Sequence, residues 1–236
     1  MVYNNTVIDN GVIDNVGIKV MATKDHSLDN KIIDAALEEF SNYGFQKASL
    51  HKIANKAEVT TGALYTRYKN KDALFTALIN PLLDDFKPYY KDIADRYYKA
   101  QAKKDADSFI EAMKYECDIY FEVLISHKNQ SNLLFNKSNG SEAESLWKKF
   151  IDMKIEGTVS FFETFAKEKS KRENSNKILE DFAIDRNAIS MLMNMQFSLF
   201  EQVINLELNK EDAKKCINTL DDFIVYGWKN LFEKYL

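Results

Sequence analysis

Residues 49–71 read SLHKIANKAEVTTGALYTRYKNK, and this stretch decides the fold of the N-terminal part of the chain. Ile53, Ala54 and Ala57 share one face of a first short helix. Leu64 occupies the matching inner position of a second short helix, and a tight turn separates the two. Small and polar side chains are left on the outer face. This pattern predicts a helix-turn-helix, which lays its second helix in the major groove of DNA.

Capping residues extend the prediction on both sides. Ser49, Thr60 and Asn70 each precede an apolar-periodic run, where their side chains suit the N-cap position. Gly44 follows an earlier run and supplies a stop for its helix. The predicted helices of this part span residues 29–43, 49–56, 60–67 and 70–86.

Charge sets this region apart from the rest of the chain. Between residues 46 and 71 six Lys and Arg face a single acid, Glu58, so the segment carries a net charge of +5. The whole chain carries −4, so the remainder carries −9. A basic patch on an acidic body is typical of local contact with DNA, and a merely solvated helix face is the alternative.

Composition predicts an all-α fold. The 236 residues include only 7 Gly and 2 Pro, whereas the many turns of an all-β chain recruit both. The 16 Phe, 12 Tyr and 7 Met indicate a well-filled core, and one apolar enough to hold a cavity. Beyond the N-terminal part, the predicted helices span about residues 89–103, 105–127, 142–170, 178–208 and 210–235, the fourth of which is open to a break near Asp185.

Several classes of protein are disfavoured. Cys117 and Cys216 lie far apart and form no CxxC pair, so we expect reduced thiols in a cytoplasmic protein. The 3 His are scattered, so we expect no metal site and no cofactor. No Gly-rich phosphate loop, GxSxG or HExxH motif is present, so an enzyme is not expected. No apolar run approaches the roughly 18 residues of a membrane span.

The chain divides into three predicted parts. Residues 1–24 contain VIDN twice and read as a flexible arm. Residues 25–80 form the helix-turn-helix domain, and residues 81–236 form a helical second domain. Pro81 lies at the boundary, within the fourth helix, where proline removes a hydrogen bond and bends the axis.

Three segments together resemble the tetracycline-repressor (TetR) family of bacterial transcriptional regulators. They are IIDAALEEFSNYGF at 32–45, IANKAEV at 53–59 and TTGALYTRYKNKDALF at 60–75, within a match that covers about residues 29–79. The family often has Gly in the turn where Glu58 stands, so a left-handed backbone there would be strained. Tyr68 replaces the usual Phe.

The resemblance implies a set of DNA contacts. Ser49 and His51 would touch phosphate or base edges at the start of their helix, and Thr60 and Thr61 would face the major groove. Gly62 and Ala63 would let bases approach, while Tyr65 and Lys71 would bind phosphate. Because Arg67 is the only long base reader on the recognition helix, the operator sequence is not readable from the chain.

The resemblance also implies a second domain that binds a small effector and forms a homodimer on a palindromic operator. The abundance of aromatic residues favours a largely apolar effector. The predicted pocket residues are Tyr115, Tyr120, Phe121, Trp147, Phe161, Phe165, Met191 and Met195. The predicted dimer interface, on the last two helices, comprises Phe197, Phe200, Ile204, Leu220, Ile224, Gly227, Trp228 and Leu231. For both sets the alternative is the subunit's own core.

Two function classes follow. The first is a regulator, most often a repressor, in which the effector moves the fourth helix through the bend at Pro81 and changes the separation of two recognition helices. The alternative is a helical protein-interaction module without DNA binding, which would not need the basic segment between residues 46 and 71.

Overall fold

The computed structural model describes residues 26–103, 106–173 and 185–235, and these residues form helices without any strand. The predicted all-α fold is confirmed. In chain order the elements are α2 (His26–Lys47), α3 (Leu50–Lys56), α4 (Thr61–Arg67), α5 (Lys71–Lys103), α6 (Ala106–Ser126), α7 (Lys128–Asn132), the π-helical turn η1 (Leu133–Lys137), α8 (Glu142–Glu173), α10 (Arg186–Asn205) and α11 (Lys210–Tyr235). The arm predicted at residues 1–24 lies outside the described residues.

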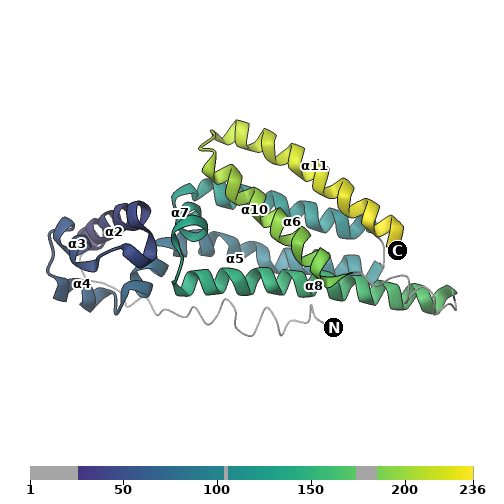
Figure 1. The fold of residues 1–236 in the computed structure, drawn as a ribbon, viewed down its shortest axis with the longest axis horizontal. Helices are drawn as coiled ribbons and strands as arrows, with labels where there is room; N and C mark the ends of the chain where they lie inside the picture. The colour runs from purple at the N-terminus through teal and green to yellow at the C-terminus, as the bar shows by residue number, and fades with distance from the viewer. Residues whose placement is uncertain (1–25, 104–105, 174–184, 236) are drawn as a thin grey trace.

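The helices α2, α3 and α4 gather at one end of the elongated molecule (Figure 1). Their predicted inner face is confirmed, since Ile53, Ala54 and Leu64 are buried. Beneath them, the ring centroids of Phe40 and Phe75 lie 5.0 Å apart in an edge-to-face contact. Such aromatic contacts add about 0.5–1.5 kcal/mol beyond area burial, so this pair helps to hold the N-terminal helices together.

The end predicted for the first helix at Gly44 is a kink instead. Gly44 adopts φ 70° and ψ 170°, which is not helical, and α2 resumes as far as Lys47. Glycine has no Cβ and reaches this conformation at little cost. The kink turns Phe45 inward, where its ring centroid lies 5.4 Å from that of Phe75.

Helix α5 corrects the predicted break between residues 86 and 89. It runs unbroken from Lys71 to Lys103 through Pro81 and Pro88. Each proline removes one helical N–H. Leu82 and Phe86 are nevertheless buried between the two prolines, so packing outweighs the local preference to stop. A domain boundary at residue 81 remains a prediction.

The remaining helices form an elongated bundle. In Figure 1, α5, α6 and α8 run along the long axis, and α10 and α11 cross them obliquely. The short α7 and η1 were not predicted, and they bring residues 133–141 against the N-terminal helices. There Gln46 Nε2 donates to Asn139 Oδ1 at 3.2 Å, and the Glu142 amide donates to Asp72 Oδ1 at 2.8 Å. Among the described residues, α5 and this contact therefore link the two ends of the molecule.

Among the described residues, no helix is both long and apolar enough to cross a membrane.

Candidate nucleic-acid interface and ligand cavity

Two of the three predicted N-caps, Ser49 and Thr60, begin the helices of the helix-turn-helix. Ser49 Oγ accepts a hydrogen bond from the Lys52 amide at 3.4 Å, and Thr60 Oγ1 accepts one from the Ala63 amide at 3.0 Å. Both caps are therefore confirmed. The Ser49 amide also donates to Glu39 Oε1 at 3.0 Å, which ties the start of α3 to α2. Because each hydroxyl accepts within the chain, its own proton remains available as a donor to an external acceptor.

The outer face of α4 is open to an external partner. Gly62 is exposed, and a Cβ built there would meet only Thr60 Oγ1, at 3.8 Å, so packing within the chain does not require a glycine. Tyr65, one turn further, has 49% of its surface exposed. Thr61 and Ala63 are half-buried at the rim of this face. His51 is exposed on α3, and its Nδ1 lies 3.3 Å from Asn55 Nδ2.

Two basic residues of the segment between residues 46 and 71 form hydrogen bonds to other parts of the chain. Arg67 Nε donates to Asp29 Oδ1 at 2.7 Å, so the only long base reader of α4 is held against α2. Lys71 Nζ donates to the Gln46 carbonyl at 3.0 Å and lies 5.0 Å from the centroid of the Phe45 ring. Burial lowers the pKa of Lys71, although the nearby carboxylates of Asp72 and Glu39 act in the opposite direction.

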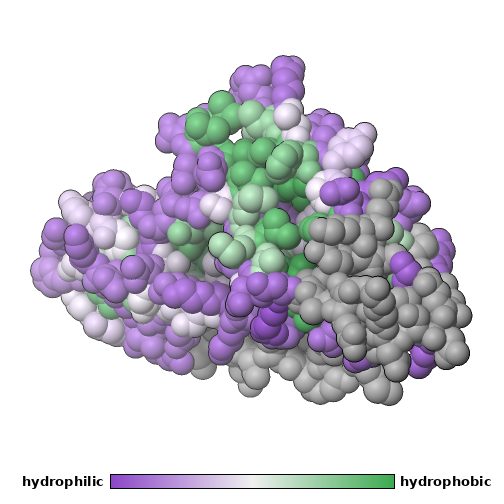
Figure 2. Space-filling view, turned by 45° about the vertical axis from the view of Figure 1, so that its right-hand side comes forward, coloured by the Kyte–Doolittle hydropathy of each residue, from purple (hydrophilic) through white to green (hydrophobic). Residues whose placement is uncertain are grey.

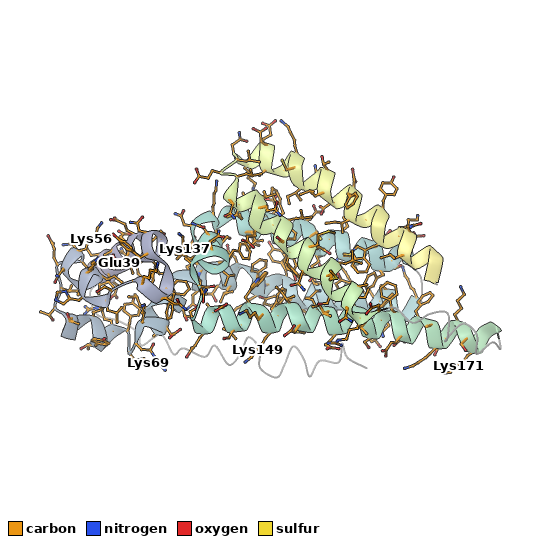
Figure 3. The ribbon with its side chains drawn as sticks, viewed as in Figure 1. Glu39, Lys56, Lys69, Lys137, Lys149 and Lys171 are labelled. Carbon is orange, nitrogen blue, oxygen red and sulfur yellow. The ribbon has the colours of Figure 1, made fainter. Side chains whose placement is uncertain are left out.

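The basic patch is narrower than the segment's net charge suggests. The acids of α2 neutralise part of it, since Glu38 pairs with Lys56 and Asp29 pairs with Arg67. Lys47, Lys52 and Lys69 remain exposed, and none of the ion pairs among the described residues includes them. Figure 3 shows Lys56 and Lys69 on opposite sides of the N-terminal unit. Sequence reasoning missed this neutralisation because the partners lie on a different helix.

A small cavity lies within the bundle at the meeting of α5, α6, α8, α10 and α11. Its volume is about 10 Å³, room for roughly one water molecule. It is lined by Tyr97, Phe109, Met113, Glu116, Tyr120, Lys154, Thr158, Met193, Gln196, Phe197 and Trp228.

Of these lining residues, Tyr120 alone belongs to the predicted pocket. Met191 and Met195 were wrongly placed, because they lie on the outer face of α10 with 73% and 42% of their surface exposed. Tyr115 is half-buried beneath the Arg96 guanidinium, which lies 3.7 Å from its ring centroid. The other predicted pocket residues pack elsewhere in or against the core: Phe121, Trp147, Phe161 and Phe165.

A buried ion pair forms part of the cavity wall. Lys154 Nζ lies 2.7 Å from both carboxylate oxygens of Glu116. Tyr97 donates its hydroxyl to Glu116 Oε2 at 2.7 Å, and Tyr120 donates to Oε1. Burial, followed by the Glu116 charge, raises the pKa of Tyr120 well above its ordinary value. Sequence reasoning missed this pair because Glu and Lys on a helix usually mark its solvated face.

Most residues of the predicted dimer interface are not on the surface of this chain, so that prediction is largely wrong. Five of its residues are buried within this chain: Phe197, Phe200, Ile204, Ile224 and Trp228. Leu220 and Leu231 are half-buried. Gly227 faces outward, and a Cβ there would meet nothing within 4 Å, so no other helix among the described residues approaches it closely.

Other apolar side chains are exposed on the same two helices. On α11, Phe223 and Tyr226 have 69% and 73% of their surface exposed, beside Gly227. On α10, Met191 and Met195 are exposed one turn apart. Figure 2 shows apolar side chains gathered on the surface of the second domain, where α10 and α11 lie. Such a patch on a folded domain usually marks an interaction site.

The described residues contain no group of three or more His, Cys, Asp and Glu suited to a metal ion.

Comparison with known proteins assigns the N-terminal unit. Residues 32–78 match the family described as bacterial regulatory proteins, tetR family. The match places this helix-turn-helix end of the chain, residues 32–78, in the TetR family. The chain is 39% identical to the A-factor receptor protein of Streptomyces griseus over 49 residues, which are 21% of this chain and 18% of that protein. It is 44% identical to the HTH-type transcriptional regulator SrpR of Pseudomonas putida over 62 residues, which are 25% of this chain and 29% of that protein.

Solved structures extend the TetR-like fold over most of the chain. A Clostridium perfringens putative fatty acid metabolism regulator is 22% identical, with a TM-score of 0.50 over 84% of this chain and 97% of that one. NalD of Pseudomonas aeruginosa, a repressor of a multidrug efflux pump, is 20% identical, with a TM-score of 0.51 over 81% of this chain and 92% of that one. At this identity the likeness concerns the fold alone.

Proposed function

We propose that this TetR-family chain is a sequence-specific DNA-binding transcriptional regulator that represses its target and is released by a small effector. The observation that carries the proposal is the capped helix α4, which presents Gly62 and Tyr65 outward at one end of the molecule. Relatives of the helix-turn-helix segment support it, since they include HTH-type transcriptional regulators and a probable operon repressor of Escherichia coli.

The proposed DNA contacts are of two kinds: contacts to phosphate, which position the protein, and contacts to bases, which read the sequence. Tyr65 donates its hydroxyl to a phosphate, and the exposed Lys47 and Lys69 add charge without direction. At Gly62 the backbone is open to a close approach by the bases. Because Asp29 holds Arg67, the remaining base contacts come from short side chains such as Thr61. Lys71 Nζ donates one N–H to the Gln46 carbonyl, and its other N–H groups remain available to bind a phosphate.

We further propose a homodimer that reads a palindromic operator. Its interface is the exposed apolar face of α10 and α11, which comprises Met191, Met195, Phe223, Tyr226 and Gly227. A second copy is the fitting occupant, because a helix-turn-helix reads paired half-sites in dimers and a two-fold interface places one patch against itself. Because Gly227 has no side chain, a helix of the partner has room to approach α11 closely at this position.

The proposed signal travels along α5. Tyr97, near the end of this helix, lines the cavity, and the same helix begins at Lys71 against Gln46. A ligand that displaces Tyr97 therefore acts on an element that reaches the helix-turn-helix. The contact of Gln46 with Asn139 gives a second connection. An effector shifts the equilibrium only if it binds the two arrangements with different affinities.

A binding titration tests the proposal. The full chain is titrated by fluorescence anisotropy onto the DNA upstream of its own gene, together with the variants Tyr65→Phe and Tyr98→Phe. A hydrogen bond to a charged phosphate is worth about 1.5–3 kcal/mol, so we expect Tyr65→Phe to weaken binding by about tenfold or more. Tyr98 is also exposed, with 62% of its surface accessible, but it lies on α5, so Tyr98→Phe serves as the control and should bind like the wild type.

The titration also separates the alternative of a helical protein-interaction module. Such a module has no use for an exposed, capped α4 and would show no preference for upstream DNA over a scrambled duplex. Equal, weak binding of wild type and both variants to both duplexes would favour the module.

A further inference from the structure

The side-chain amide of Gln196 is only half satisfied. Its Nε2 donates to Cys117 Sγ at 3.0 Å, but its Oε1 is buried and accepts no hydrogen bond from the described residues. Gln196 has 5% of its surface exposed and lines the cavity. An unpaired buried acceptor costs about 1–3 kcal/mol, so its presence in a core calls for a reason.

The neighbouring donors of the cavity are already committed. Tyr97 and Tyr120 give their hydroxyl protons to Glu116, and Lys154 lies between its two carboxylate oxygens. Thr158 Oγ1 donates to the Lys154 carbonyl at 3.0 Å. A molecule that satisfies Gln196 Oε1 must therefore bring its own donor.

The charges of the cavity are balanced as well. Glu116 and Lys154 form one pair, with 6% and 10% of their side chains exposed, so their net charge is zero. A charged ligand would add an uncompensated charge to a site removed from water, which is strongly unfavourable. The rest of the lining is apolar and largely aromatic: Phe109, Met113, Met193, Phe197 and Trp228.

We propose that the cavity binds an uncharged, largely aromatic molecule that donates one N–H or O–H hydrogen bond to Gln196 Oε1. This inference rests on the proposed function, because it names the chemical class of the effector. It refines the expectation of a largely apolar effector by adding one donor group and excluding net charge.

Binding of such a molecule moves the helices that surround the cavity. The present volume of about 10 Å³ holds roughly one water molecule, so an aromatic ring enters only if the lining helices part. These helices include α5, which begins next to α4. The ligand thus selects a different arrangement of the helix that leads to the DNA-binding end, as an effector requires.

The test compares two probes of nearly equal shape. Indole carries an N–H donor, and benzofuran has an oxygen in its place. We expect calorimetric titration of the full chain, without DNA, to show indole binding about tenfold tighter than benzofuran, as one unmatched buried hydrogen bond implies. In Gln196→Met the ratio should fall to about one. Gln202→Met, at an exposed position of α10, is the matched control and should keep the tenfold ratio.

The same titrations define what overturns the inference. Equal affinities for indole and benzofuran in the wild type, a preference that survives Gln196→Met, tighter binding of benzoate than of phenol, or binding of neither aromatic probe would each contradict it. Gln196→Met removes an unpaired polar group, so a melting curve close to that of the wild type confirms that the variant folds. Because no DNA is present, the result stands apart from the DNA titration, and either can fail without the other.

Discussion

At the scale of single residues, the turn of the helix-turn-helix carries the clearest local strain. Glu58 has φ 59°, in the left-handed region where a Cβ is unfavourable. The strain predicted for this position is therefore present. Lys31 Nζ lies 2.7 Å from Glu58 Oε2 and holds the pKa of that carboxyl below its ordinary value, but both side chains are exposed and an exposed pair contributes little.

We therefore expect Glu58→Gly to stabilise the protein. Relief of the left-handed strain should outweigh the loss of the pair with Lys31 and raise the melting temperature by about 2–4 °C. The control is Glu111→Gly, at an exposed position inside α6, where glycine lacks that advantage and should lower the melting temperature by a similar amount. A fall in melting temperature for Glu58→Gly would show that the Lys31 pair outweighs the backbone.

Local features such as the N-caps could be predicted from the sequence, because they depend on residues a few positions apart. The side chains of Ser49 and Thr60 each accept a hydrogen bond from the amide three residues later, and this spacing can be read directly from the sequence. The binding of Arg67 to Asp29 could not be predicted in the same way, since the two residues are 38 positions apart and meet only after α2 and α4 pack.

At the scale of helices, the packing of α11 on α6 buries a carboxyl group. Asp221 has 5% of its surface exposed. Burial, followed by the negative charge of Asp118 on α6, raises its pKa from 3.8 to about 6, whereas Lys114 acts in the opposite direction. The folded state thus binds this proton more tightly than the unfolded state does. Stability from this group falls as pH rises from about 4 to about 6.

We expect Asp221→Asn to remove this pH dependence. At pH 7.5 the variant should melt at a higher temperature than the wild type, because the wild type must keep a buried charge. Below about pH 4 the two melting temperatures should converge. Asp95→Asn, at an exposed position of α5, is the control and should not show this convergence. A lower melting temperature of Asp221→Asn at pH 7.5 would mean that the charged form makes a favourable contact.

The limits of helix prediction appear in α5 and η1. The helix was predicted to end between Pro81 and Pro88, but both prolines lie within α5, where Leu82 and Phe86 between them are buried. The π-helical turn at residues 133–137 has no periodic apolar signal of its own, and its position depends on contact with the N-terminal helices. Tertiary packing thus overrides local preference at both places.

At the scale of the whole molecule, helical periodicity identified the apolar faces of the last two helices but not what those faces pack against. Phe197 and Trp228 lie on these faces, yet both point into the chain's own core. Phe223 and Tyr226 lie on the opposite face of α11 and are exposed. The cavity was missed for the same reason, because it unites side chains from five helices, and a sequence pattern shows only one helix at a time.

The dimer proposal makes a direct prediction for the exposed face. A glutamate at the centre of an apolar interface is unfavourable, so Phe223→Glu should weaken dimerisation by at least tenfold in analytical ultracentrifugation. Tyr98→Glu, at an exposed position of α5, should leave the dimer intact. A wild-type protein that is monomeric at micromolar concentration, or a Phe223→Glu variant that dimerises normally, would contradict the proposed face.

The most direct test of the account is the salt dependence of the wild-type chain's affinity for the DNA upstream of its own gene, measured against a scrambled duplex. A regulator that binds through a basic patch should prefer the upstream DNA by about 10³-fold or more at physiological salt and lose affinity steadily as salt rises. Equal affinity for the two duplexes across the salt range would contradict the central claim that the capped helix α4 reads DNA.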